Sequence, residues 1–147
     1  MTHNALAETA TPETLPPVEA LSSTNAVAIP SYCLALRGAT VASANTAAAI
    51  YAATRELLTR LVEQNDLALA DIASAFFTVT SDLTAAFPAK AARQIGWTHV
   101  ALLCATEIPV PGSLVSCVRV LVHLNATRPR ATYHGVYING AEKLLEE

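Results

Sequence analysis

The sequence predicts an α+β fold in which a mixed β-sheet has its helices packed on one side. Five apolar stretches of strand length first alternate with two helical segments and then follow one another directly, in the order β-α-β-α-β-β-β. Hydrophobic residues make up 52% of the 147-residue chain and charged residues only 14%. A single domain of this length can bury a large core.

The first half of the expected domain contains a strand, a long helix and a second strand. Residues 31–42, SYCLALRGATVA, form an apolar strand that we expect to turn at Gly38. Residues 45–65 have apolar residues at helical spacing, with Asn45 as the expected N-cap. Residues 72–80, IASAFFTVT, form the next strand.

The second half begins with a short helix and ends in three strands. Pro88 suits the first turn of a helix over residues 87–95, which Gly96 ends. The three strands are expected over residues 99–106, 113–125 and 132–139. In the middle one, valines and a leucine alternate with Arg119, Leu121 and His123, so its two faces differ.

The first 30 residues differ from the rest in composition. They are rich in Ala, Thr, Pro and Glu and contain no Lys or Arg, which predicts a disordered extension over residues 1–30 and one domain over residues 31–147. They show neither the apolar run of a secretory signal nor the arginines of a transit peptide. No apolar stretch is long enough to span a membrane, so we expect a cytoplasmic protein.

The composition excludes several classes of function. A net charge of -3 gives no general attraction to nucleic acid or to an anionic membrane, so the expected partner is a small molecule. Cys33, Cys104 and Cys117 show no CxxC spacing and are expected to be reduced, buried thiols. The four histidines show no metal-ligand spacing, so no metal site is expected. The low charge content also predicts a surface partly covered by neighbouring subunits.

One segment, residues 80–97, gathers charge in a chain that has little of it. Lys90 and Arg93 lie three residues apart, on one face of the helix that Pro88 begins and next to Phe87. Two neighbouring cations indicate a binding site for an anion. The alternative is a solvated helix face.

Arg119 is the anomaly of the predicted sheet, because it lies in the middle of the apolar run CVRVLV. A guanidinium buried there without a partner would be strongly unfavourable. It must therefore pair either with an acid such as Glu107 or with a bound anion.

Several polar residues share this character of lying in apolar strands or at the ends of elements. They are Arg37, Lys90, Arg93, Cys104, Glu107, Arg119 and Tyr137. Together with the stretches RGAT, FPAKAAR, GW and CVRV, in this order and at these separations, they resemble the monofunctional chorismate mutases of the trimeric AroH type. The resemblance extends over about residues 35–140.

The resemblance implies a pseudo-α/β-barrel subunit, a homotrimer with active sites between subunits, and the conversion of chorismate to prephenate without a cofactor. This reaction follows the shikimate pathway in aromatic amino-acid biosynthesis. A Claisen rearrangement is intramolecular and needs no nucleophile or proton relay. It needs a site that holds a flexible dianion in a compact shape and stabilises the charge that develops on the ether oxygen.

The resemblance also assigns roles to residues. Arg119 is expected at the ether oxygen and a substrate carboxylate, and Arg37 and Tyr137 at a carboxylate. Glu107 and Cys104 are expected to meet the ring hydroxyl. These assignments make Arg37, Glu107 and Arg119 the expected catalytic residues.

Other residues are expected to act from a neighbouring subunit or not at all. Phe87 would wall the site, and Lys90 and Arg93 would add positive potential at its mouth. The tail departs from the family, since Leu145 falls where the family often has an arginine. We therefore expect the tail to contribute no cation to substrate binding.

Two other functions are compatible with the pattern. One is an imine or enamine deaminase, which is also trimeric and binds carboxylates with an interface arginine. The other is a non-catalytic trimeric binder of small molecules. The joint presence of Arg37, Glu107 and Arg119 favours the mutase over both.

Overall fold

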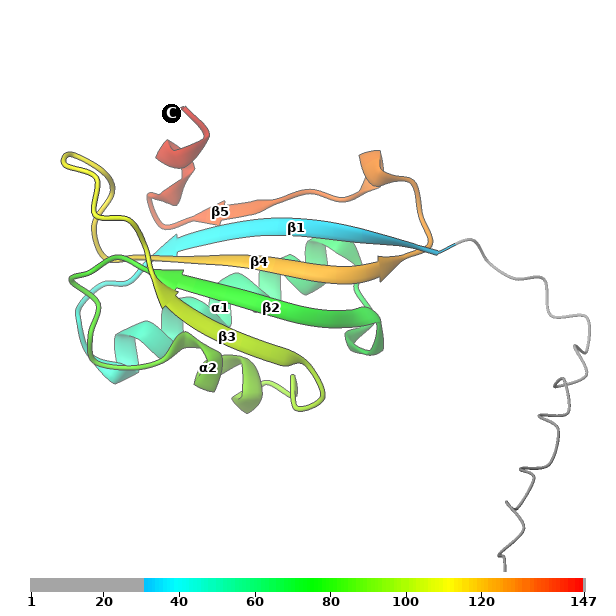
Figure 1. Ribbon diagram of the computed structural model, residues 1–147, viewed down its shortest axis with the longest axis horizontal. Helices are drawn as coiled ribbons and strands as arrows, with labels where there is room; N and C mark the ends of the chain where they lie inside the picture. Colours follow the sequence, from blue (N-terminus) through cyan, green and yellow to red (C-terminus); the bar gives the residue numbers. More distant parts are fainter. Residues whose placement is uncertain (1–30, 147) are drawn as a thin grey trace, which may run out of the picture.

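The centre of the protein is a five-stranded mixed sheet, seen in a computed structural model that describes residues 31–146. The strands are β1 (Tyr32–Val41), β2 (Ile72–Val79), β3 (Ala101–Thr106), β4 (Cys117–Ala126) and β5 (Val136–Ile138). Their order in the sheet is β3-β2-β4-β1-β5. β4 is antiparallel to β1 and β2, whereas β3 and β5 run parallel to β2 and β1 (Figure 1).

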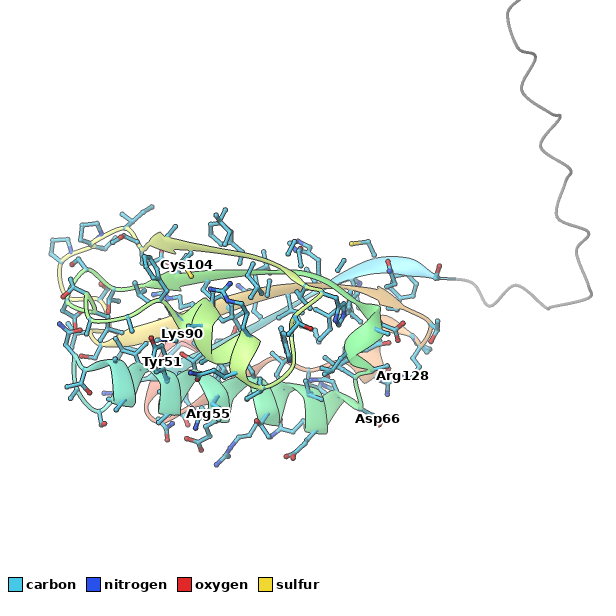
Figure 2. All side chains as sticks on the ribbon, turned by 90° about the horizontal axis from the view of Figure 1, so that it is seen from below. Tyr51, Arg55, Asp66, Lys90, Cys104 and Arg128 are labelled. Atoms are coloured by element: carbon cyan, nitrogen blue, oxygen red, sulfur yellow. The ribbon has the colours of Figure 1, made fainter. Side chains whose placement is uncertain are left out.

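Both helices lie on the same side of this sheet. α1 (Ala47–Asn65) and α2 (Pro88–Gln94) form one layer below it in Figure 2. The remaining regular elements are the short 3-10 helices η1 (Leu69–Asp71), η2 (Arg130–Thr132) and η3 (Ala141–Leu145). The predicted fold class, a mixed sheet with helices on one side, is therefore confirmed.

The pleat of β4 sorts its side chains between the two faces. Val118, Val120, Val122 and Leu124 are buried in the core, in the same cluster as Leu57, Leu58 and Leu61 of α1. Arg119, Leu121 and His123 point to the opposite face and are half-buried. The alternation predicted for this strand is confirmed, and it leaves the face without helices available for a binding site.

Gly38 does not turn the chain as predicted, because β1 continues through it to Val41. A Cβ at this position would lie 3.1 Å from both Leu57 Cδ1 and the carbonyl oxygen of Val136. The missing side chain thus allows α1 and β5 to approach β1 closely. Gly38, the glycine of the RGAT stretch, is therefore required for packing and not for a turn.

The expected N-cap of α1 was also wrong by one residue. Thr46 is the cap, with its Oγ1 accepting a hydrogen bond from Ala49 N at 3.2 Å. Asn45 instead reaches the loop before α2, where its Oδ1 accepts from Thr84 N at 2.9 Å and Ala85 N at 3.0 Å. Asn45 therefore fixes the segment that leads into α2.

The predicted boundaries of the second helix are confirmed, whereas the predicted burial of the three thiols holds for only one of them. α2 begins at Pro88 and is followed by Gly96 at φ 100°, as predicted.

The expectation of three buried thiols holds only for Cys117, since Cys33 is exposed and Cys104 is half-buried. Cys33 is exposed because it lies on the face of β1 that no helix covers.

Asn65, the last residue of α1, is a buried amide that ties the helix to the approach to β5. Its Nδ2 donates to the carbonyl oxygens of Leu61 and His134, both at 2.9 Å, and its Oδ1 accepts from His134 N at 2.7 Å. Arg128 donates to the backbone oxygen of Asn65 and stacks on the ring of Tyr133, 4.6 Å from its centroid. One side chain thus sets the position of the segment before β5.

No helix within residues 31–146 has the length and apolar character needed to cross a bilayer. The predicted extension over residues 1–30 lies outside the described residues.

We expect Asn65→Ala to lower the free energy of unfolding by about 2–3 kcal/mol, because backbone groups of Leu61 and His134 lose their partner. Asn125 on β4 is exposed, and Asn125→Ala is the matched control, with an expected change below about 0.5 kcal/mol. Urea unfolding followed by circular dichroism measures both. Equal losses of stability in the two variants would contradict the assignment.

Candidate active site

A pocket of about 490 Å³ opens on the sheet face that the helices leave uncovered. The strand registers place two rows of side chains across its floor. The first row is Thr78, Arg119, Ala39 and Tyr137, and the second is Phe76, Leu121 and Arg37. Glu107, just after β3, and Leu144 and Leu145 of η3 add to the lining. Ala39 itself is buried, because it packs in a small cluster with Cys117 and Ala141.

Arg119 lies on the central strand β4 and lines this pocket. Its side chain is 34% exposed, but its Nε is buried and has no hydrogen-bond partner among the described residues. Its two neighbours in the row, Ala39 and Thr78, carry no charge. Buried polar atoms are nearly always hydrogen-bonded, so the unpartnered Nε shows that no described side chain saturates the donors of this guanidinium, which lines the pocket.

Glu107 is held close to Arg119 but does not neutralise it fully. Its Oε2 lies 3.8 Å from Arg119 Nη1, too far for a hydrogen bond. Thr78 Oγ1 donates to Oε2 at 2.9 Å, and Ile108 N donates to Oε1 at 3.1 Å. The carboxylate is thus kept in place by neutral donors.

The same hydrogen bonds control the ionisation of Glu107. The pKa of this carboxyl is lowered, chiefly because the Thr78 hydroxyl donates to the charged form. Burial acts in the opposite direction, and the Ile108 N–H and the charge of Arg119 add to the lowering. Glu107 is therefore an anion at neutral pH and a hydrogen-bond acceptor for a ligand.

Arg37 and Tyr137 complete the polar lining. Arg37 lies on β1 on the same face as Arg119, and it has neither an ion pair nor a hydrogen bond to another described side chain. Tyr137 lies opposite Ala39 in the parallel pairing of β1 and β5. Of the eight predicted site residues, the chain thus brings Arg37, Glu107, Arg119 and Tyr137 together around one pocket.

The three predicted residues around α2 lie outside this pocket within one chain. Phe87 is 72% exposed, and Lys90 and Arg93 are exposed on α2. Lys90 Nζ lies 5.6 Å from the ring centroid of Tyr51, and Figure 2 shows the two side chains together in the helix layer. Their contribution to the site of a neighbouring subunit stays a prediction.

Cys104 is not among the residues that line the pocket. It is opposite Phe77 in the pairing of β2 and β3, and its half-buried side chain packs against the main core. The pleat of β3 therefore points its thiol to the helix side, away from Glu107. This placement gives no support to a contact between the thiol and the ring hydroxyl.

Asp82, in the charged segment before α2, has a structural role. Its Oδ2 accepts hydrogen bonds from Ser116 N at 2.9 Å and from Ser116 Oγ at 2.8 Å. Ser116 has a positive φ of 53°, which is unusual for a side-chain-bearing residue. Asp82 fastens the chain at this strained entry to β4.

Sequence reasoning missed Thr78, Ala39 and Leu144. Thr78 was detectable as a polar residue in the apolar strand IASAFFTVT. Its contact with Glu107 was not, because it depends on β2 lying between β3 and β4. The packing of Leu144 against the small cluster of Ala39, Cys117 and Ala141 likewise depends on the return of η3 over the sheet.

The fold and pocket define a small α+β domain with an arginine-lined site for an anionic ligand, and comparisons with known proteins specify its family. The family model for chorismate mutase type I matches residues 33–147. The chain is 47% identical over 110 residues to chorismate mutase AroH of Thermus thermophilus, covering 74% of this chain and 90% of that one. It is 35% identical over 104 residues to chorismate mutase AroH of Bacillus subtilis, covering 70% and 82%.

A solved structure supports the same relationship. A chorismate mutase from Clostridium thermocellum is similar with a TM-score of 0.73 and 52% identity, covering 75% of this chain and 98% of that chain. The chain therefore belongs to the type I chorismate mutase family, and the resemblance seen in the sequence is confirmed. The protein is accordingly an isomerase of this family.

We expect Thr78→Val to raise the pKa of Glu107, because it removes the largest cause of the lowering, and Thr78→Ser to leave it near the native value. Titration of the Glu107 carboxyl by 13C NMR measures this pKa directly. Since the folded pKa lies below the unfolded value, Glu107 adds stability above roughly pH 4.3, and this is lost as the pH falls through the folded pKa. Thr78→Val should weaken this acid-range loss. Identical titrations of the Val and Ser variants would refute the role of the hydroxyl.

Proposed function

We propose that this protein converts chorismate to prephenate by a Claisen rearrangement in the pocket formed by Arg37, Glu107, Arg119 and Tyr137. The observation that carries the proposal is the Arg119 guanidinium, which lines the pocket and whose Nε has no hydrogen-bond partner among the described residues. The substrate is a dianion whose ether oxygen gains negative charge as its carbon–oxygen bond breaks. A charged donor that is already in position in a partly buried site stabilises that charge without reorganisation of the protein.

Arg119 is the proposed catalytic residue at the ether oxygen. It lies on the central strand of the sheet, between two paired strands, so its backbone is held firmly. Removal of one well-placed donor of this kind typically costs about 3–4 kcal/mol of transition-state stabilisation. A donor fixed in this way suits the reaction better than a mobile one, because it need not move as the charge develops.

Arg37 and Tyr137 are proposed to hold the substrate carboxylates. Arg37 belongs to the row next to that of Arg119, which separates the two positions by about 7 Å along the strands. Two arginines at this separation can bind two carboxylates of one molecule and so restrict its shape. The phenol of Tyr137, on the far side of Ala39, adds a neutral donor.

Glu107 is proposed to accept a hydrogen bond from the ring hydroxyl. Its lowered pKa keeps it ionised, and both its oxygens already accept one hydrogen bond each. A carboxylate has further lone pairs, so it can accept one more. Its negative charge also keeps the ring hydroxyl, rather than a carboxylate, on this side of the pocket.

We further propose a homotrimer whose sites lie between subunits, working in the cytoplasm. Large apolar side chains on β3 and in the loop between β3 and β4 are exposed: Leu103 by 60%, Ile108 by 74%, Val110 by 57% and Val115 by 65%. Such exposure is typical of surfaces covered by another subunit. Phe87, Lys90 and Arg93, which are exposed in one chain, would then complete the site of a neighbour.

The test of the proposed activity is the ultraviolet loss of chorismate, with prephenate confirmed by acid conversion to phenylpyruvate. We expect Arg119→Ala to lower kcat at least about 100-fold, because the developing charge loses its donor. Circular dichroism and light scattering check that the variant keeps its fold and assembly. No loss of chorismate with folded wild-type protein would refute the mutase and favour the deaminase or the binder.

Mixing of two impaired variants tests the site between subunits. Arg119→Ala chains and Lys90→Ala/Arg93→Ala chains are unfolded together and refolded in equal amounts. In a closed ring of three, random mixing restores both halves in about a quarter of the sites, so at least about a quarter of the wild-type activity is expected, including any that the Lys90→Ala/Arg93→Ala site retains. Activity no higher than the mean of the two unmixed variants would place the whole site in one subunit.

A further inference from the structure

A second groove adjoins the reaction pocket. Its volume is about 290 Å³, and it lies between β1 and the segment that leads to β5. Its lining includes Arg37, Arg130, Tyr133, Tyr137 and Leu145. Three of these, Arg37, Tyr137 and Leu145, also line the larger pocket, so the two hollows meet at the Arg37 side chain.

The groove exists because β5 is short. It pairs only with residues Gly38, Ala39 and Thr40 of β1, so residues 33–37 of that strand have no β5 partner. At Gly135 the chain passes so close to β1 that a Cβ would lie 2.9 Å from the carbonyl oxygen of Arg37. Before that point the chain leads back to η2, which carries Arg130. The groove is therefore bounded by fixed backbone at both sides.

The charge in this groove is entirely positive among the described residues that line it. Arg130 is exposed and makes neither an ion pair nor a side-chain hydrogen bond to another described residue. Arg128, two residues earlier, is fully engaged with Asn65 and Tyr133. The tail contributes only Leu145 to the lining, and no carboxylate lines the groove. Two like charges in one groove repel each other until an anion binds between them.

We propose that Arg130 is a further substrate-binding residue and that this groove is an entry subsite for a carboxylate of the dianionic substrate. This inference rests on the proposed mutase function. The groove opens directly onto Arg37. A carboxylate held by Arg130 and Arg37 therefore stays close to positive charge while it moves from the groove into the reaction pocket. Because Arg130 does not line the reaction pocket, it acts on substrate capture and not on the rearrangement.

A charge series at position 130 tests the proposal. Arg130→Gln is expected to raise KM about three- to fivefold, and Arg130→Glu about tenfold or more, with kcat within about twofold of wild type in both. Arg130→Lys should stay near wild type. The effects should largely disappear at about 0.5 M salt, because exposed charges are screened.

Arg60→Gln is the matched control. Arg60 is an exposed arginine of α1 that pairs with Glu56, one turn away, at 2.7 Å. The substitution changes the net charge by the same amount on the helix side of the molecule. A rise in KM for Arg130→Gln that exceeds that for Arg60→Gln supports the subsite. Equal KM values for the two, or a fall in kcat without a change in KM, would overturn it.

A binding measurement separates this inference from the mutase activity. If wild-type protein does not convert chorismate, the proposed function fails, and the groove is then tested by calorimetric titration with prephenate. Weaker binding to Arg130→Gln than to Arg60→Gln would still support a carboxylate subsite. Equal binding to both variants would overturn it.

Discussion

The antiparallel ladder between β1 and β4 is the constraint on which the site depends. Its register runs without interruption from Tyr32 opposite Ala126 to Val41 opposite Cys117. Because side chains alternate along both strands, the same ladder that buries Leu34, Leu36 and Val120 against the helix layer turns Arg37 and Arg119 to the other face. A shift of β4 by one residue against β1 would turn Arg119 into the core and Val118, Val120 and Val122 out of it, so the register is fixed by the cost of that exchange.

The ion pair at the site is weak by construction. Thr78 and the Ile108 N–H hold Glu107 at 3.8 Å from Arg119, where the two charges attract each other but share no hydrogen bond. A tight bidentate pair would satisfy Arg119 and remove its donors from a ligand. The Thr78 hydroxyl therefore keeps Arg119 available to a ligand. This role cannot be recognised from Arg119 or Glu107 alone. The arrangement keeps the positive charge of Arg119 directed at the pocket.

Most of the elements could be predicted from the sequence because local signals define them. The alternation in β4, the helical spacing in α1, and the Pro88 and Gly96 boundaries of α2 all depend on residues close in the chain. Four of the site residues were also predictable as charged or polar residues in apolar surroundings. Gly38 was misread because its reason lies in α1 and β5, not in its neighbours. Asn45 was misread because a side chain able to cap its own helix bonds a loop 39 residues away instead.

What the sequence could not provide was the arrangement across the sheet. Thr78 and Ala39 flank Arg119 only because β2 and β1 are the two neighbours of β4. The orientation of Cys104 is likewise a consequence of its pairing with Phe77. Cys104 and Glu107 are three residues apart, and residues that differ by an odd number in an extended chain face opposite sides. A separation of three residues brings side chains together on a helix but not on a strand.

The position of η3 has a practical consequence for work with the protein. Leu144 and Leu145 form part of the pocket wall, so whatever follows them in a recombinant chain begins at the mouth of the pocket. A polyhistidine tag attached there would bring several cationic or metal-binding side chains next to an arginine-lined site for anions. Such a tag competes with the native charges for the same ligands and distorts apparent affinities. Kinetic work is therefore best done with purification handles at the other end or with the tag removed.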